Sequence, residues 1–404
     1  MTSPASSLAA SRAPLEIRHF FTYFRDLGGV QSLLRQHLAE DARRGADSRA
    51  AIFLDPLGCE HPNVFTAGMS GRDSVLSARR KYAQRVEPRP ASAAVYHNFW
   101  GLPMFADLDQ SARRLALFHS DWPGVERALK AQAGLTDGIM CVNEPLKRQL
   151  REHLPEMPED RLLVLPLPID PPAPAPVRAP LRGRTLVCGY SGRVSILQKR
   201  LDFLPEFCQR LDEAGVDYRF EALGDGSLLS TLERKLGGHP RVRLHGRKSG
   251  AEYWSIIRQW DVNISFSQYE GLPLSLLETL HQGSIPIFPR IQSGGDVYVE
   301  KVSPRLLYTF GRMDEAAAIL QWIAGLPEEA VQDLRQRSMS LTEPHLRGSY
   351  FDKFSGFVAD IARRPRISIH RWQRRPCYFS DFLPFFLLSR VCVPGFYKRA
   401  PAAV

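Results

Sequence analysis

Short apolar runs alternate with amphipathic segments along most of the chain. In the first half the runs and helical patterns are regular, with runs at 16–24, 50–55, 93–98, 113–118, 137–142 and 161–166 and helical patterns at 28–44 and 143–154. Each run is short, apolar and rich in β-formers, as strands buried on both faces of a parallel sheet are. The alternation therefore predicts βαβ units around a parallel sheet.

A proline-rich segment separates this half from a second one. Residues 166–184 contain seven prolines, which favour a semi-rigid linker over a helix or a central strand. Beyond it the alternation restarts, with strands expected at 185–191, 218–224, 241–246, 261–267, 285–289 and 305–310 and helices at 201–214, 228–236, 250–259, 274–282, 313–325 and 327–341. The pattern predicts two doubly wound α/β domains, residues 1–165 and 185–360, that face each other across a cleft.

The composition of the chain is compatible with two domains and indicates the cellular compartment. A chain of 404 residues suits two domains, and 44% hydrophobic with 24% charged residues is typical of globular proteins. The six cysteines show no ligand or disulfide spacing, and we expect reduced thiols. The first 15 residues lack a signal-peptide core, and no apolar run approaches the roughly 18 residues of a membrane span. We therefore expect a cytoplasmic protein.

The net charge of +10 is concentrated near the C-terminus. Residues 361–404 hold nine basic side chains against one acid, so they carry +8 and leave +2 for the other 360 residues. Aromatic residues and a short apolar run accompany these charges, a composition that suits the surface of an anionic membrane. A final helix that returns to the first domain, a contact with a protein or nucleic acid, and disorder are the alternatives.

Loops that directly follow strands are the places to look for chemistry, because ligands of such sheets lie beyond the carboxyl ends of the strands. In the first half, Gly28 and Gly29 open a helix, where backbone N–H groups can approach an anion or simply make a tight turn. His97, Asn98 and His119 follow two other strands. Each histidine could bind a hydroxyl, although a lone histidine more often packs in a core.

The second half offers a basic loop and two acids. Gly192 and Arg193 follow the first strand of this half, and Lys199 precedes the next helix, a set that suits a diphosphate or solvated surface. Glu270 and Glu278 are separated by a turn, since Pro273 favours the first turn of a helix. One acid is thus expected in a loop and the other on a helix, either side of a helix start that favours anions.

Together these motifs resemble the GT-B glycosyltransferases, in particular the large retaining family 4 of nucleotide-sugar enzymes. The resemblance is strongest over residues 186–290, in "SGRVSILQKRLDFL", "LGDGSLLSTLE", "VRLHG" and "DVNISFSQYEGLPLSLLETLHQGSIPIF". It departs from the family at Thr279, where a small residue is usual, and in one extra residue before the following proline. These departures remove no charged group.

The resemblance implies a role for each candidate residue. On the donor side, Arg193 and Lys199 would bind the diphosphate, Glu278 the ribose and Glu270 the transferred sugar, with Gly192, Gly271 and Leu272 near the phosphates. On the other side, Gly28 and Gly29 would line the cleft, His119 would contact the sugar or polarise the acceptor, and His97 and Asn98 are further candidates on the acceptor side.

The implied partners are a nucleotide-diphosphate sugar as donor and a glycan or lipid-linked acceptor, in cell-envelope or exopolysaccharide synthesis. The family needs no metal, so we expect no cofactor, and we expect no nucleic acid partner. A nucleotide-sugar epimerase or phosphorylase of the same fold is one alternative. A catalytically silent binding or scaffold protein is the other.

Overall fold

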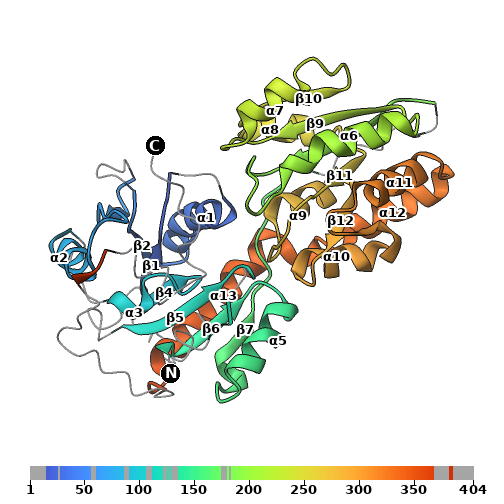
Figure 1. The fold of residues 1–404 in the computed structure, drawn as a ribbon. Helices are drawn as coiled ribbons and strands as arrows, with labels where there is room; N and C mark the ends of the chain where they lie inside the picture. Colours follow the sequence, from blue (N-terminus) through green and yellow to red (C-terminus); the bar gives the residue numbers. More distant parts are fainter. Residues whose placement is uncertain are drawn as a thin grey trace, which may run out of the picture.

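The computed structural model consists of two α/β domains joined by the proline-rich segment (Figure 1). It describes residues 15–25, 28–55, 61–85, 91–105, 112–121, 125–126, 129, 135–173, 180–181, 183–367 and 382–384. Each domain is built around one sheet, and the neighbouring strands of each sheet run parallel to one another. The two-domain, doubly wound architecture predicted from the sequence is confirmed.

The first sheet has the order β3-β2-β1-β4-β5-β6-β7. Its strands are β1 (Leu15–Phe21), β2 (Ala46–Ile52), β3 (Val64–Thr66), β4 (Ala93–His97), β5 (Arg113–Phe118), β6 (Gly138–Cys141) and β7 (Leu162–Val164). Four described helices belong to the same part of the chain, α1 (Gly29–Arg43), α2 (Val75–Arg85), α3 (Leu102–Phe105) and α5 (Glu144–His153). The chain order reverses between β1 and β4, which places the switch point of this domain between those two strands.

The second sheet has the order β10-β9-β8-β11-β12-β13. Its strands are β8 (Leu186–Ser191), β9 (Tyr218–Leu223), β10 (Val242–Leu244), β11 (Val262–Ile264), β12 (Ile285–Arg290) and β13 (Leu307–Thr309). The helices between and after them are α6 (Leu204–Glu213), α7 (Leu229–Leu236), α8 (Gly250–Ile257), α9 (Leu274–His281), α10 (Gly294–Val302), α11 (Met313–Ala324) and α12 (Glu328–Ser340). Here the switch point lies between β8 and β11.

Local sequence signals explain where several helices begin and end. The side chain of Asn143 caps α5 by accepting a hydrogen bond from Leu146 N at 2.9 Å. A capping box formed by Ser293 and Asp296 starts α10. Pro273 is the N-cap of α9, and Gly283, with φ of 77°, ends it. The predicted boundaries of α9 agree with the structure for this reason.

Other elements were not predicted. The short strand β3 and the helices α2, α3 and α10 lack a clear period in the sequence, and α10 carries two glycines at its start. Helix α7 begins directly after Leu228, which makes no side-chain capping hydrogen bond. Such short or glycine-bearing elements are stabilised by the surrounding packing more than by local propensity.

The final described helix, α13 (Arg347–Arg363), returns to the first domain, beside β5 and β6 (Figure 1). Arg347 pairs with Glu40 at 2.7 Å, and Tyr350 bonds His37 of α1 at 3.0 Å. The predicted boundary had assigned residues up to 360 to the second domain. The structure packs this helix on the first domain instead, because its buried aromatic face finds an apolar surface there.

The basic C-terminal segment lies largely outside the described residues. Of residues 368–404 the structure describes 382–384, and Ser74 and Pro384 form an isolated bridge. Within the described part of the chain, no helix has the length and apolar character needed to cross a membrane.

Candidate active site

Two loops of the second domain meet at its switch point. One follows β8 and contains residues 192–199, and the other follows β11 and contains residues 265–273. A pocket opens between them, lined by side chains from both loops and from the first turns of α9, including Ser191, Lys199, Ser267, Pro273 and Ser275. Polar and cationic groups thus converge where open parallel sheets bind their ligands.

Lys199 lines this pocket and pairs directly with Glu270, which lies beside it on the loop after β11. Their ammonium and carboxylate groups form an ion pair, and both side chains are largely buried, with exposed fractions of 15% and 6%. The Gln198 amide donates to the other Glu270 oxygen at 3.4 Å. A buried carboxylate is therefore held in one orientation by two donors that precede the helical segment starting at Leu201.

Arg193 lies on the same loop, exposed, and pairs with no acid among the described residues. The backbone next to Arg193 is held by hydrogen bonds to the turn after β9. Val194 N donates to Asp225 O at 2.9 Å, and Leu228 N donates to Val194 O at 3.1 Å. A Cβ on Gly224 would stand 1.8 Å from Gly192 O, so only glycine permits this approach. The turn at 224–226 therefore supports the basic loop, and Gly192 is part of that contact.

Glu278 projects from α9 on the same side of the sheet. It accepts a hydrogen bond from Tyr253 of α8 at 2.5 Å, and the Tyr253 hydroxyl lies 3.4 Å from Ser191 Oγ. Burial raises the pKa of Glu278 to about 7, although the hydrogen bond from Tyr253 acts in the opposite direction. Glu278 is thus a half-buried carboxyl that is ready to accept further hydroxyl hydrogen bonds.

Glu278 predicts how the stability of the ligand-free protein depends on pH. Because its pKa is raised from 4.5 to about 7, the folded state binds more protons than the unfolded state in this window, and stability falls as pH rises through it. Glu278→Gln should reduce that fall by up to about 3 kcal/mol. Urea unfolding of both proteins at several pH values from about 4.5 to 8 measures the difference, and identical pH profiles would contradict it.

The loop after β11 also forms the seam between the domains. Gly271 makes an isolated antiparallel bridge with Ser120 of the first domain, and a Cβ on Gly271 would lie 1.8 Å from His119 O. At the start of α10, a Cβ on Gly294 would lie 1.9 Å from Asn143 Nδ2. Gly271 lets its backbone approach the backbone of the first domain, and Gly294 leaves room for the Asn143 side chain. The seam places the first domain directly against the loop that holds Glu270.

The glycine loop before α1 faces the same region. A Cβ on Gly29 would lie 3.6 Å from Leu274 Cδ1, at the first residue of α9. Gly28 is the N-cap of α1 and has extended backbone, with φ of 178°. Gly29 thus lies beside the second domain, whereas the role expected for Gly28 at the cleft stays a prediction. Leu272 is 3% exposed and packs in the core next to Gly271.

The three candidates on the acceptor side have different positions. His119 is 7% exposed at the seam, and its backbone N–H donates to Asn98 Oδ1 at 2.8 Å. Asn98 has left-handed backbone, with φ of 52°, which orients this contact. His97 is fully buried, and both its ring nitrogens face other histidines. The expectation that His97 contacts an acceptor is therefore wrong, since a strand end points inward as readily as outward.

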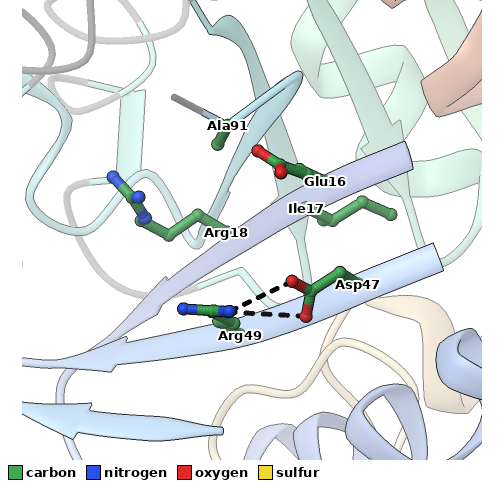
Figure 2. A pocket seen from close by; sticks show the side chains of 6 residues that line it. All are labelled: Glu16, Ile17, Arg18, Asp47, Arg49 and Ala91. Atoms are coloured by element: carbon green, nitrogen blue, oxygen red, sulfur yellow. Dashed lines mark hydrogen bonds and ion pairs between the residues drawn. The ribbon is translucent and has the colours of Figure 1, made fainter. Parts of the chain in front are cut away.

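A second pocket lies in the first domain, at the amino-terminal ends of its strands (Figure 2). It is lined by residues near the starts of β1 and β2 and before β4, namely Glu16, Ile17, Arg18, Asp47, Arg49 and Ala91. The Arg49 guanidinium pairs with Asp47 at 3.2 Å within the lining. This pocket is far from the loops at the carboxyl ends, where the candidate residues gather.

Sequence reasoning missed several residues of the site. Four further residues contact the candidate residues or the seam, namely Tyr253, Gln198, Asn143 and Gly294. Of these, only Gly294 had a signal in the sequence, because two glycines after Ser293 indicate a close approach of another segment. Tyr253 looks like any apolar helix position, and its pairing with Glu278 depends on how α8 and α9 pack.

The fold is that of known glycosyltransferases. The structure matches WaaG, a glycosyltransferase of lipopolysaccharide biosynthesis, with a TM-score of 0.65 at 12% identity over 85% of this chain and 99% of that one. It matches Anabaena HepE in complex with UDP and glucose with a TM-score of 0.66 at 14% identity over 86% and 100%. The match to TarM, with a TM-score of 0.55 at 15% identity, covers 70% of this chain and 58% of that protein. No curated protein sequence matches the chain.

The two facing Rossmann-like domains of this chain are a GT-B fold. Residues 185–325, which carry the basic loop and both glutamates, match the family described as glycosyl transferases group 1. The chain therefore has a GT-B fold, and its second domain is similar to the glycosyl transferases group 1.

Proposed function

We propose that the chain is a retaining glycosyltransferase that moves a sugar from a nucleotide-diphosphate sugar to an acceptor hydroxyl. The observation that carries the proposal is the pocket lined by Lys199, whose ammonium pairs with Glu270, with Arg193 on the loop of Lys199 and Glu278 on α9. Two cations suit a diphosphate, and two carboxylates suit the hydroxyls of ribose and sugar.

In this proposal the second domain holds the donor. The diphosphate would displace Glu270 from Lys199, freeing the carboxylate to accept hydrogen bonds from the sugar. Arg193, Lys199 and the N-terminus of α9 would stabilise the charge that develops on the leaving diphosphate. No metal is required by this arrangement, because the side-chain cations and helix dipole supply the positive charge.

The first domain would hold the acceptor against the donor. His119 and Gly29 lie at the seam, beside Gly271 and Leu274 of the second domain. With no covalent nucleophile assigned, we propose front-face attack in which the leaving phosphate takes the acceptor proton, so that the anomeric configuration is retained.

The structural relatives support a proposal for the acceptor class. WaaG acts in lipopolysaccharide biosynthesis, and WaaB is an outer-core galactosyltransferase. We propose that this chain likewise glycosylates a cell-envelope glycan or a lipid-linked precursor, in the cytoplasm, with the basic residues of 361–404 bringing it to the inner face of the membrane. A shortened chain that ends near residue 367 should then bind anionic vesicles less well than the full chain.

A panel of nucleotide sugars tests the donor assignment. A ligand that binds only the folded state stabilises it by about 2.7 kcal/mol at a concentration one hundred times its dissociation constant. We expect one of UDP-, GDP- or ADP-sugars to raise the unfolding temperature of the full chain, and the effect to disappear in Lys199→Ala. A silent panel would favour the scaffold alternative.

A further inference from the structure

A line of buried histidines leads from the seam into the first domain. His119 Nε2 lies 2.7 Å from His97 Nδ1, and His97 Nε2 lies 3.1 Å from His19 Nδ1. The residues belong to the neighbouring strands β5, β4 and β1, His119 directly following its strand. The rings of His119 and His97 are stacked, with centroids 5.0 Å apart. Each contact joins two ring nitrogens, so one of each pair must donate and the other accept.

Asp41 of α1 ends this line. His19 Nε2 lies 3.7 Å from Asp41 Oδ2, and both side chains are fully buried. The same carboxylate lies 3.2 Å from His37 Nδ1 and accepts a hydrogen bond from the hydroxyl of Ser48. On the far side of His37, its Nε2 lies 3.0 Å from the hydroxyl of Tyr350 on α13, so α13 closes the network.

The charge states of this network follow from burial and pairing. Burial lowers the pKa of His119 to about 3 and that of His19 to about 4, and it lowers the pKa of His97 well below its ordinary value. Burial opposes ionisation of Asp41, but the charge and hydrogen bonds of His37 and His19 outweigh it, and the pKa of Asp41 is lowered. Burial therefore favours neutral imidazoles along the line, and the donors around Asp41 favour its carboxylate form.

A neutral imidazole carries one N–H, and an ionised carboxylate only accepts. The nitrogen of His19 that faces Asp41 has no hydrogen-bond partner in the part of the chain that the structure describes. The charge of Asp41 favours a proton on this nitrogen, because a lone pair there would face a negative charge. His19 Nδ1 then accepts from His97 Nε2, and His97 Nδ1 accepts from His119 Nε2. We propose that Asp41, acting through His19 and His97, fixes His119 as the Nε2–H tautomer and leaves Nδ1 as a permanent hydrogen-bond acceptor.

The consequence for chemistry rests on the proposed function, whereas the tautomer does not. An acceptor nitrogen at the seam recognises a hydroxyl group and rejects a ring oxygen or carbonyl, which cannot donate. His119 would thus select a hydroxyl of the sugar or the acceptor. Asp41, His19 and His97 are positioning residues in this scheme, and no proton passes along the line.

A competing arrangement is a buried metal ion. Ligand atoms of His19, His37 and Asp41 all lie within 4.8 Å of one another, a separation that one cation could bridge. A metal on His19 Nε2 would require a lone pair there and a proton on Nδ1. It would therefore reverse the line and place the proton of His119 on Nδ1, so that the two arrangements predict opposite tautomers.

The tautomer can be measured on the full ligand-free chain with ¹⁵N-labelled histidine. Long-range ¹H–¹⁵N correlations distinguish a protonated ring nitrogen from a bare one, and His119→Gln identifies the His119 signals by their loss. We expect His119 with Nε2 protonated and Nδ1 bare. A protonated Nδ1 would overturn the proposal, and zinc recovered in equimolar amount by elemental analysis would then assign the metal arrangement.

Two variants test the role of Asp41. Asp41→Asn can donate its amide to His19 Nε2, so the line should reverse and the proton of His119 should move to Nδ1, while the signals of His239 in the other domain stay unchanged. Unchanged His119 signals in a folded Asp41→Asn protein would also overturn the proposal.

If this variant does not fold, His97→Phe keeps the aromatic packing but cuts the line, and His119 should become a mixture of both tautomers. A single Nε2–H tautomer in His97→Phe would refute control by Asp41. A silent nucleotide-sugar panel would leave all these results unaffected.

Discussion

Arg193→Ala and Lys199→Ala are each expected to lower the turnover rate by about 10²–10³-fold, or roughly 3–4 kcal/mol of transition-state stabilisation. Each cation would stabilise negative charge on the leaving diphosphate, which is largest in the transition state. Release of nucleoside diphosphate from the donor that the panel identifies measures this rate. Arg193→Lys should recover only part of the loss, because a point charge replaces the planar fork of the guanidinium.

The control for these variants is Arg210→Ala. Arg210 lies on α6 of the same domain, and its ion pairs with Glu206 and Glu213 are exposed and weak. Its removal should leave turnover within about twofold of the wild-type rate, a change below 0.5 kcal/mol. Lys199→Ala also leaves the Glu270 carboxylate buried without its cation, so the stability of this variant must be measured. Lys199→Met is the second variant, because methionine has a volume similar to that of lysine. Wild-type turnover in both Arg193→Ala and Lys199→Ala would refute the donor assignment.

Gly271→Ala is expected to separate the two domains. The added Cβ would meet His119 O at 1.8 Å and Ser120 Cα at 3.0 Å, and both are backbone atoms that cannot rotate away. The second domain itself should fold normally. Because a misplacement of about 1 Å between reacting groups can cost about 10²-fold in rate, turnover should fall by at least that factor. Small-angle scattering should show a larger radius of gyration.

Gly238→Ala is the matched control for this substitution. Gly238 is in the same domain, and a Cβ there would have no atom within 4 Å. It should leave both scattering and turnover unchanged. Gly294→Ala, whose Cβ would meet Asn143 Nδ2 at 1.9 Å, should act like Gly271→Ala at a second contact between the two domains. If Gly271→Ala had wild-type scattering and turnover, the closed seam would not be part of the working enzyme.

The candidate site was predictable to the extent that it depends on loops after strands. The order of strands predicts that four charged residues lie near one another, since parallel strands bring the loops at their carboxyl ends to one edge of the sheet. These residues are Arg193, Lys199, Glu270 and Glu278. Glu270 and Glu278 do lie on a loop and a helix, as Pro273 indicated. Their partners were not predictable, because Tyr253 and Gln198 reach them through packing between segments far apart in the sequence.

The histidines show the same limit more sharply. His97 and His119 stand at equivalent strand ends in the sequence, yet one is closed off inside the domain and the other reaches the seam. His97 is enclosed between His119 and His19, and α1 and α13 bring Asp41, His37 and Tyr350 to the far side of His19 from distant parts of the chain.

The sequence by itself determined the class of fold, the proline-rich junction and the loop positions of the charged residues, because apolar period, proline and glycine act over a few neighbouring positions. Tertiary structure alone decided three features: which cation pairs with which acid, that Gly271 and Gly294 form a seam, and that Asp41 ends a buried line of histidines. These features join atoms separated by tens to hundreds of residues, and such contacts form only when two elements pack together.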